Sequence, residues 1–167
     1  DLGLVGESEP YLRRMNRGLI MGPDGQKMSK SKGNVIDPDA VVAEVGADAV
    51  RMYLAFIGPY NETGSYPWNP GGTAGVRRFL DRVWKLGNEI IDLPDAPNPD
   101  LDKILNQTIK KVGEDIASLK MNTGVSALMI LLNKMSEVEN VGLEQWKQFL
   151  QLLTPFAPHL CHELAER

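Results

Sequence analysis

Apolar side chains at the spacing of an α-helix dominate the second half of the sequence, and this pattern constrains the fold more than any other feature. The first set is Val76, Phe79, Leu80, Val83, Gly87 and Ile90, and the same spacing returns in three further segments. Such spacing gathers the apolar side chains on one face of each helix. Helices with short connections pack as antiparallel neighbours. The sequence therefore predicts an antiparallel α-helical bundle over residues 76–167.

A small mixed α/β unit is predicted before the bundle, over residues 1–58. "SEPYLRRMNRG" (8–18) is typical of a short helix, and "GLIM" (18–21) of a short apolar strand. Asp37 as N-cap and Pro38 at the first helical position open another helix, which Gly46 ends before a further helix follows. The expected fold class is thus α+β, mostly α. Inside the bundle, "KMNTG" (120–124) predicts a break, with Asn122 or Thr123 capping the next helix.

The segment between these two parts, residues 59–75, is rich in Gly, Pro, Asn and Ser and holds no period. This composition predicts a connector without regular structure that packs on its surroundings. Trp68 within it is expected to anchor the connector to the core, and stacking on a nucleic-acid base is the alternative. "GGTAG" (71–75) lacks the spacing of a dinucleotide fingerprint and is interpreted as the lead-in to a helix.

Composition limits the classes of function. The net charge is −4, so no protein-wide basic field attracts nucleic acid, and any polyanion site must be local. The single cysteine, Cys161, excludes an internal disulfide, and with His159 and His162 beside it we expect no metal site. No apolar run approaches the roughly 20 residues of a membrane span and no signal-peptide pattern opens the chain. We therefore expect a soluble, cytoplasmic location.

The strongest local feature is "GPDGQKMSKSKGNVIDP" (22–38). It alternates lysines with serines between two glycines: Gly25, Lys27, Ser29, Lys30, Ser31, Lys32 and Gly33. The glycines let the backbone approach a ligand closely, and ammonium groups with hydroxyls suit phosphoryl chemistry. The spacing does not match a Walker P-loop. The alternative is a solvated run of charge on a turn.

"KMSKS" (27–31) resembles the second signature motif of class I aminoacyl-tRNA synthetases, and residues 27–59 resemble that motif with its downstream helices. "GVRRFLDRVWKL" (75–86), "MNTGVSALM" (121–129) and "LLTPFAPHLCHEL" (152–164) resemble, in the same order, segments of the leucyl-tRNA synthetases. Valyl- and isoleucyl-tRNA synthetases are close alternatives. The resemblance covers nearly the whole chain and implies the C-terminal part of a catalytic core, followed by a helical anticodon-binding-type domain.

The resemblance also implies roles for single residues in ATP binding. Lys30 matches the lysine that assists attack on the α-phosphate, and Lys27 would support loop closure or contact phosphate. Met28 would pack near the adenine, while Ser29 and Ser31 would order the loop. ATP, accompanied by Mg²⁺, is the implied substrate, and no metal site is expected in the chain itself.

The other signature of the family, H-x-G-H, is absent from this sequence. Because the chain begins at Asp1 rather than at a methionine and ends within a predicted helix, we expect a piece of a larger polypeptide. The implied partners are tRNA-Leu, leucine, ATP and the missing N-terminal half of the catalytic core, and we expect no leucyl-adenylate from the chain alone. The alternative is a non-catalytic module that binds RNA or a protein partner.

Four basic residues of one predicted helix are the candidates for RNA contact: Arg77, Arg78, Arg82 and Lys85. Arg78, Arg82 and Lys85 share a helix face beside the apolar stripe. The use of this domain for tRNA in the family implies contacts to phosphates, which position the RNA without reading its bases. A solvated helix face is the alternative.

Overall fold

The computed structural model describes residues 18–60, 62–91 and 95–167, together with residues 3, 4, 6, 11, 14 and 15. Most of the helix predicted over residues 8–18 lies outside these residues. The elements in chain order are β1 (Ile20–Met21), a 3₁₀ turn η1 (Lys30–Lys32), α1 (Pro38–Val45), α2 (Ala47–Phe56), β2 (Tyr66–Pro67), α3 (Pro70–Ile91), α4 (Pro99–Ala117), α5 (Met121–Met135), α6 (Leu143–Leu153) and α7 (Pro158–Ala165).

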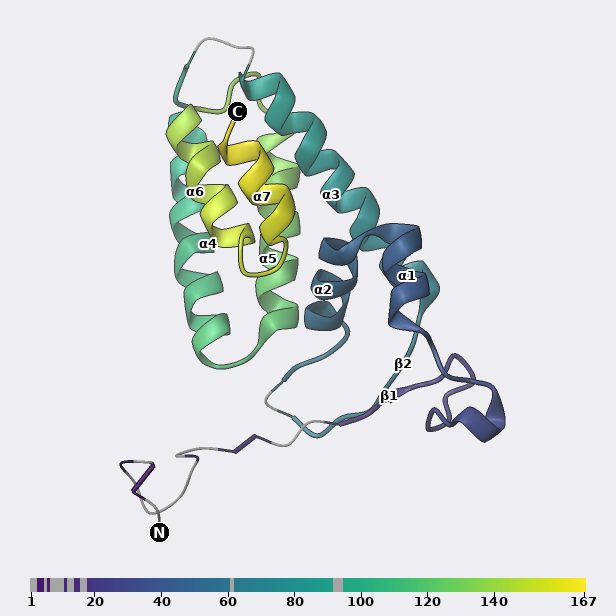
Figure 1. Cartoon of the computed structure of the whole chain (residues 1–167). Helices are drawn as coiled ribbons and strands as arrows, with labels where there is room; N and C mark the ends of the chain where they lie inside the picture. The colour runs from purple at the N-terminus through teal and green to yellow at the C-terminus, as the bar shows by residue number, and fades with distance from the viewer. Residues whose placement is uncertain are drawn as a thin grey trace.

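Helices make up most of the described chain, with one small parallel sheet, so the predicted mostly-α class with an α/β part is confirmed in outline (Figure 1). The strand predicted at "GLIM" is β1. Its partner β2 was not predicted: Ile20 lies opposite Tyr66 and Met21 opposite Pro67. No helix in the described ranges has an apolar stretch long enough to cross a bilayer.

The start of α1 follows the sequence prediction. The side chain of Asp37 accepts a hydrogen bond from the backbone N–H of Asp39 at 3.0 Å, and Pro38 occupies the first helical position. This cap satisfies a backbone donor that the first turn of a helix leaves without a partner. Gly46, with φ of 90°, separates α1 from α2. The lysine-rich segment therefore leads directly into a well-defined helix.

The connector is shorter than predicted, because α3 begins at Pro70 and not after Gly75. Pro70 suits a first helical position, and the side chain of Asn69 accepts from the N–H of Gly71 at 2.9 Å as a cap. The glycines therefore lie inside the helix. At Gly72 a Cβ would lie 2.5 Å from the ring of Tyr53, so the glycine permits this close approach.

Trp68 anchors the connector to the core, as predicted. Its side chain is buried and meets the ring of Tyr53 edge-on, with 4.9 Å between ring centroids. The hydroxyl of Tyr53 also accepts a hydrogen bond from the N–H of Asn69 at 2.8 Å. These contacts fix the start of α3 against α2.

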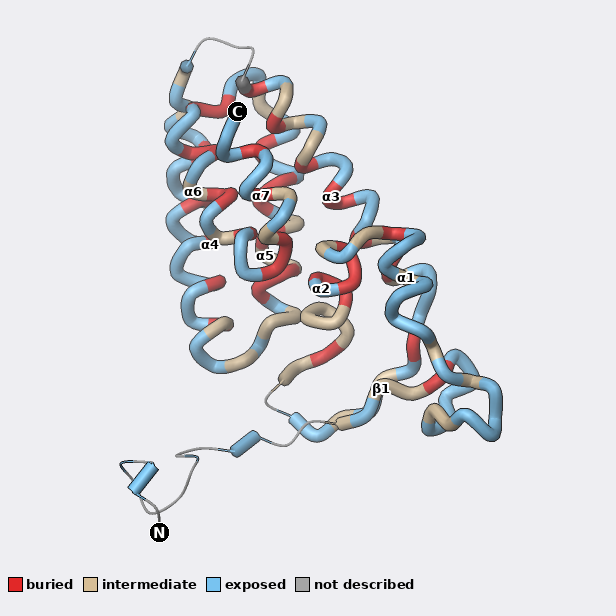
Figure 2. The backbone as a smooth tube through the Cα atoms, viewed as in Figure 1, coloured by how far each residue is buried: buried red, intermediate tan, exposed pale blue. Residues whose placement is uncertain are grey.

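The apolar face predicted for α3 is buried over its whole length, and Figure 2 shows buried positions along the inner sides of α3, α5 and α6. Helix α4 packs on α5 and α6, α7 packs on α3 and α6, and α2 contacts both α3 and α5. Trp146 and Phe149 of α6, stacked at 5.3 Å between centroids, are among the largest buried side chains. The helices share one continuous core with α2.

The cap predicted at Asn122 or Thr123 is wrong, since α5 already begins at Met121 with Lys120 before it. The chain reverses at Leu119, which has a φ of 60°. The hydroxyl of Thr123 then donates to the buried carboxylate of Asp115 at 2.7 Å instead of capping its own helix. The side chain of Lys111 pairs with the same carboxylate.

Candidate functional site in the lysine loop

The lysine loop, defined here as residues 22–34, joins β1 to the segment before α1. Its first part is a tight turn. The N–H of Gly25 donates to the carbonyl of Gly22 at 2.9 Å, and the N–H of Gly22 donates to the backbone carbonyl of Gln26 at 2.7 Å. Gly25 has a φ of 72°, a region that favours glycine. Met21 then pairs with Lys27 in an antiparallel bridge. The predicted turn is confirmed, and it reverses the chain so that Lys27 lies beside the end of β1.

Asn34 holds the second part of the lysine loop. Its Oδ1 accepts from the N–H of Ser29 at 2.9 Å, and its Nδ2 donates to the two carboxylate oxygens of Asp24 at 3.0 and 3.2 Å. The same amide group lies 3.4 Å from the carbonyl oxygen of Lys27. Sequence reasoning assigned Asp24 only to the turn and gave Asn34 no definite role. The available signal was that both residue types bond readily to nearby backbone.

Asp24 remains charged at neutral pH. The backbone N–H of Gln26, at 3.0 Å from Oδ1, lowers the pKa of this carboxyl below its ordinary value, and the side chain of Asn34 and the charge of Lys32 lower it further. Burial opposes these contributions. A charged carboxylate is the better acceptor for the amide of Asn34.

The three lysines differ in what their side chains contact. All three are exposed, but Lys32 donates to the side chain of Gln26 at 2.7 Å. Among the described residues, the ammonium groups of Lys27 and Lys30 form no hydrogen bond or ion pair. Lys30 opens the short 3₁₀ turn that ends at Gly33, whose φ is 66°. Two ammonium groups on this loop therefore remain available to an anionic ligand.

The remaining motif residues differ in their burial and contacts. Met28 is half-buried and packs against the core, and the hydroxyl oxygens of Ser29 and Ser31 lie 2.7 Å apart. The loop thus combines one apolar contact with the core, a hydroxyl pair and two exposed cations. This arrangement suits phosphate binding by point charges rather than by a rigid cradle of backbone amides.

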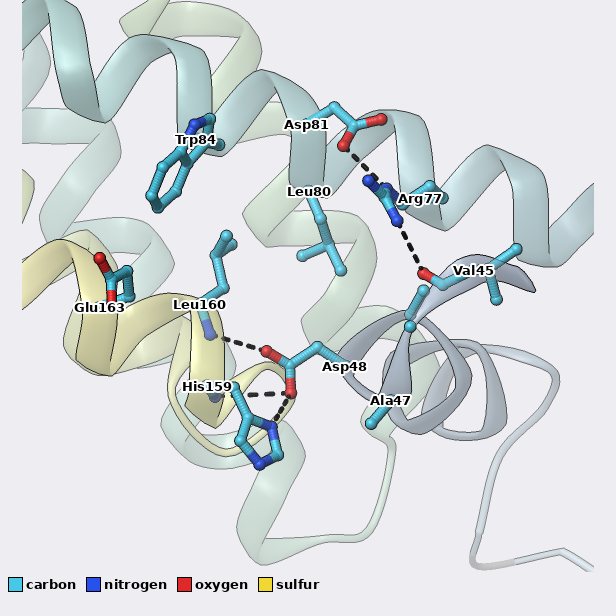
Figure 3. Close-up of a pocket in the computed structure, with 12 residues that line it drawn as sticks. Val45, Ala47, Asp48, Arg77, Leu80, Asp81, Trp84, His159, Leu160 and Glu163 are labelled. Carbon is cyan, nitrogen blue, oxygen red and sulfur yellow. Dashed lines mark hydrogen bonds and ion pairs between the residues drawn. The ribbon is translucent and has the colours of Figure 1, made fainter. Parts of the chain in front are cut away.

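A cavity of about 490 Å³ lies where the α1–α2 pair meets α3 and α7 (Figure 3). Asp48 of α2 reaches the start of α7: its Oδ2 accepts from the N–H of Leu160 at 2.8 Å, and its Oδ1 lies 2.7 Å from Nδ1 of His159. On the other side, Arg77 of α3 donates to the carbonyl of Val45 at 3.2 Å and to Asp81 at 2.8 Å. These bonds fasten the unit that carries the lysine loop to the helices.

The four basic residues predicted for RNA contact are therefore not equivalent. Arg77 is engaged at the end of α1. Lys85 lies 3.7 Å from the carboxylate of Glu89, an exposed pair. Arg78 and Arg82 are exposed, and no hydrogen bond or ion pair is recorded for them within the described part of the chain. These two arginines therefore present exposed positive charge on α3.

The side chains considered for a metal make other contacts. His159 faces Asp48, and His162 lies 3.6 Å from the carboxylate of Glu166. Cys161 is buried between them. Among the residues that the structure describes, no three histidine, cysteine or acidic side chains lie together as a metal site would require.

Known proteins resemble this chain at two levels, in its first 64 residues and over its whole length. Residues 3–64 match the family described as tRNA synthetases class I (I, L, M and V). The whole chain is 44% identical, over 171 aligned residues, to a leucine–tRNA ligase of Bdellovibrio bacteriovorus, and it spans 21% of that protein's length.

Solved structures give the same result. A LeuRS of Agrobacterium radiobacter K84, determined as a ternary complex with tRNA and LeuAMS, superposes with a TM-score of 0.81 at 34% identity, over 90% of this chain and 22% of that one. A methionyl-tRNA synthetase of Mycobacterium tuberculosis in complex with methionyl-adenylate gives a TM-score of 0.66 at 20% identity, over 89% of this chain and 36% of that one. The second likeness concerns the fold alone.

Residues 3–64, which include the KMSKS motif, match the class I tRNA synthetases, the class that the motif indicated. Within this class, the likeness that extends over the whole chain is to leucyl-tRNA synthetase.

Proposed function

We propose that this chain is the part of a leucine–tRNA ligase that carries the KMSKS loop, and that it contributes to leucine activation. The observation that carries the proposal is the 44% identity to a leucine–tRNA ligase over the whole chain. The ammonium groups of Lys27 and Lys30, which have no partner among the described residues, support it, because charge on phosphate needs such donors. The proposed substrates of the complete enzyme are ATP, with its Mg²⁺, leucine and tRNA-Leu.

Lys30 is the residue proposed to act in the chemical step. A carboxylate oxygen of leucine attacks the α-phosphorus of ATP, and the bond from that phosphorus to the bridging oxygen of the β-phosphate breaks. Negative charge then develops on the departing pyrophosphate. An exposed ammonium group on a loop that can close over the nucleotide stabilises this charge, and such donors typically change rates by about a hundredfold or more.

The neighbouring residues support Lys30 in this proposal. Lys27 adds a second positive charge for the phosphates, since its ammonium group has no recorded partner among the described residues. Ser29 and Ser31 order the loop through the 2.7 Å contact between their hydroxyl oxygens. Met28, half-buried on the core side of the loop, provides an apolar surface for the adenine. H-x-G-H would face the loop from residues that do not belong to this sequence.

We further propose that residues 76–167 form the anticodon-binding-type helical domain, with residues 1–58 completing the catalytic core and 59–75 linking the two. Arg78, Arg82 and Lys85 are assigned to tRNA phosphates, because they are exposed on one side of α3. Arg77 contributes indirectly, because its guanidinium holds α1 against α3. Such contacts position the tRNA without reading its sequence.

The amino-acid dependence of ATP–pyrophosphate exchange tests the proposal. The protein encoded by the whole reading frame that contains this sequence should exchange pyrophosphate in the presence of leucine, and residues 1–167 alone should not. Exchange that depends on valine or isoleucine would instead identify the corresponding synthetase. A whole-frame protein inactive with all three amino acids would favour a non-catalytic module that binds RNA or a protein partner.

A further inference from the structure

We infer that Asp24 and Asn34 form a polar clasp that positions Lys30 for the phosphoryl step. The inference rests on the proposed function for the role of Lys30, but the clasp itself rests on the geometry of the lysine loop. Asp24 lies in the turn after β1, Asn34 lies after the 3₁₀ turn, and their side chains meet across the base of the loop. Asn34 lies outside the KMSKS motif.

The clasp has a defined polarity. Nδ2 of Asn34 donates to both carboxylate oxygens of Asp24, and Oδ1 of Asn34 accepts from the N–H of Ser29 at 2.9 Å. Asp24 in turn accepts from the N–H of Gln26 at 3.0 Å. Position 34 therefore needs one donor and one acceptor, which an amide supplies, whereas position 24 needs acceptors.

The backbone around the clasp is shaped to allow it. A Cβ atom at Gly22 would lie 2.6 Å from the carboxylate of Asp24 and 2.9 Å from the amide nitrogen of Asn34. Both distances are below 3.0 Å, so a larger residue at position 22 would push these two side chains out of their present arrangement. The glycine, the carboxylate and the amide thus form one interlocking unit.

The clasp acts on Lys30 through the backbone. Ser29, whose N–H is bonded to Asn34, immediately precedes Lys30, and the N–H of Lys32 donates back to the carbonyl of Ser29 at 3.1 Å. Fixing Ser29 therefore fixes the start of the 3₁₀ turn and the direction in which Lys30 leaves the loop. Asn34 and Asp24 are positioning residues, because neither supplies a positive charge to the phosphates.

Exchanging the two residues gives a direct test in the whole-frame protein. Asn34→Asp places two carboxylates against each other, and Asp24→Asn/Asn34→Asp restores one donor and one acceptor between them in reversed order. Gln26→Ala is the matched control, since it removes a side-chain partner of Lys32 and leaves the clasp intact. Hydrogen–deuterium exchange at the Ser29 amide reports the clasp, and kcat and KM for leucine in ATP–pyrophosphate exchange report the positioning of Lys30.

For Asn34→Asp we expect exchange at Ser29 to accelerate about five- to tenfold, as expected for loss of one or two hydrogen bonds, and kcat to fall while KM for leucine stays within about twofold. The double variant should recover both, and Gln26→Ala should change neither. If the Ser29 amide of the double variant exchanges hydrogen as fast as that of Asn34→Asp, the clasp is overturned. Recovery of protection without recovery of kcat would overturn the positioning role. Lys30→Ala tests the proposed function separately. If this variant leaves kcat unchanged, while hydrogen–deuterium exchange in Asn34→Asp and in the double variant behaves as expected, the proposed function fails and the clasp stands.

Discussion

At the scale of single residues, the three lysines of the loop differ in their partners rather than in their exposure. Lys32 donates to Gln26 within the loop, whereas Lys27 and Lys30 have no recorded side-chain partner in the described residues. The motif could therefore be found from the sequence, but the difference between Lys32 and the other two depends on a contact that folding creates. The same holds for Asp24 and Asn34, which lie ten residues apart.

Cys161 gives a prediction at this scale. Burial raises the pKa of its thiol from 9.0 to about 12, with the charge of Asp48 adding to the rise and the hydroxyl of Thr154 opposing it. The thiol should therefore react slowly with iodoacetamide at pH 8 in the native protein and quickly in urea. Because the pKa of the thiol is higher in the folded than in the unfolded protein, the neutral thiol contributes to stability fully below pH 9. As pH rises from 9 toward 12, the unfolded thiol ionises while the folded one stays neutral, and the contribution is lost.

The control for this prediction is Cys161→Ala. The variant should lack the part of the alkaline loss of stability that the thiol causes, as followed by urea denaturation at several pH values. Native labelling as fast as labelling in urea would show that the thiol is accessible and would contradict the burial seen here.

At the scale of elements, helical periodicity predicted the buried face of α3 because apolar spacing reports burial directly. It did not predict β2, because two residues are too few to show a period. It also placed the start of α3 too late: the cap at Asn69 and Pro70 outweighed the low helix propensity of Gly71 and Gly72.

Contacts between elements that are distant in the sequence could not be predicted from sequence patterns. The bond from Arg77 to Val45 spans 32 residues, and that from Leu160 to Asp48 spans 112. From the sequence, Arg77 was indistinguishable from Arg78 as a candidate for RNA contact. The structure separates them, because only Arg77 is bonded to the carboxyl end of another helix.

Asp48 joins α2 to the start of α7. Asp48→Ala removes the acceptor for the N–H of Leu160 at the start of α7 and should lower the free energy of unfolding by about 1–2 kcal/mol, the usual cost of losing a cap. Asp48→Asn should cost less, since an amide oxygen remains. Urea denaturation measures both, with Asp39→Ala in the exposed first turn of α1 as the control. Equal stability of Asp48→Ala and the unchanged protein would remove Asp48 as the cap of α7.

At the scale of the whole molecule, the unit that carries the lysine loop is fastened to the helices at several points. Arg77 and Asp48 line the cavity shown in Figure 3, and Arg51 of α2 donates to the carbonyl of Pro155 between α6 and α7 at 3.2 Å. Helix α2 thus contacts α3, α5 and α7. In the proposed function, these contacts hold the ATP loop at a fixed position relative to the tRNA-binding helices.

The proposed tRNA contacts predict a strong dependence of binding on salt. Because each phosphate contact releases counterions, affinity of the whole-frame protein for tRNA-Leu should fall steeply between about 50 and 200 mM salt. Arg78→Ala/Arg82→Ala should weaken binding and reduce the slope of log affinity against log salt by roughly 1–2. Filter binding measures this, with Lys103→Ala on α4 as the control. An unchanged slope in the double variant would exclude these arginines from phosphate contact.

The role proposed for Lys30 is to stabilise charge on the phosphates of ATP. The most direct measurement is leucine-dependent ATP–pyrophosphate exchange by the whole-frame protein carrying Lys30→Ala, beside Lys103→Ala, which removes another exposed lysine far from the loop in the sequence. We expect Lys30→Ala to lower kcat by about a hundredfold or more with little change in KM for leucine, and Lys103→Ala to match the unchanged protein. Equal kcat for the two variants would contradict the role assigned to Lys30.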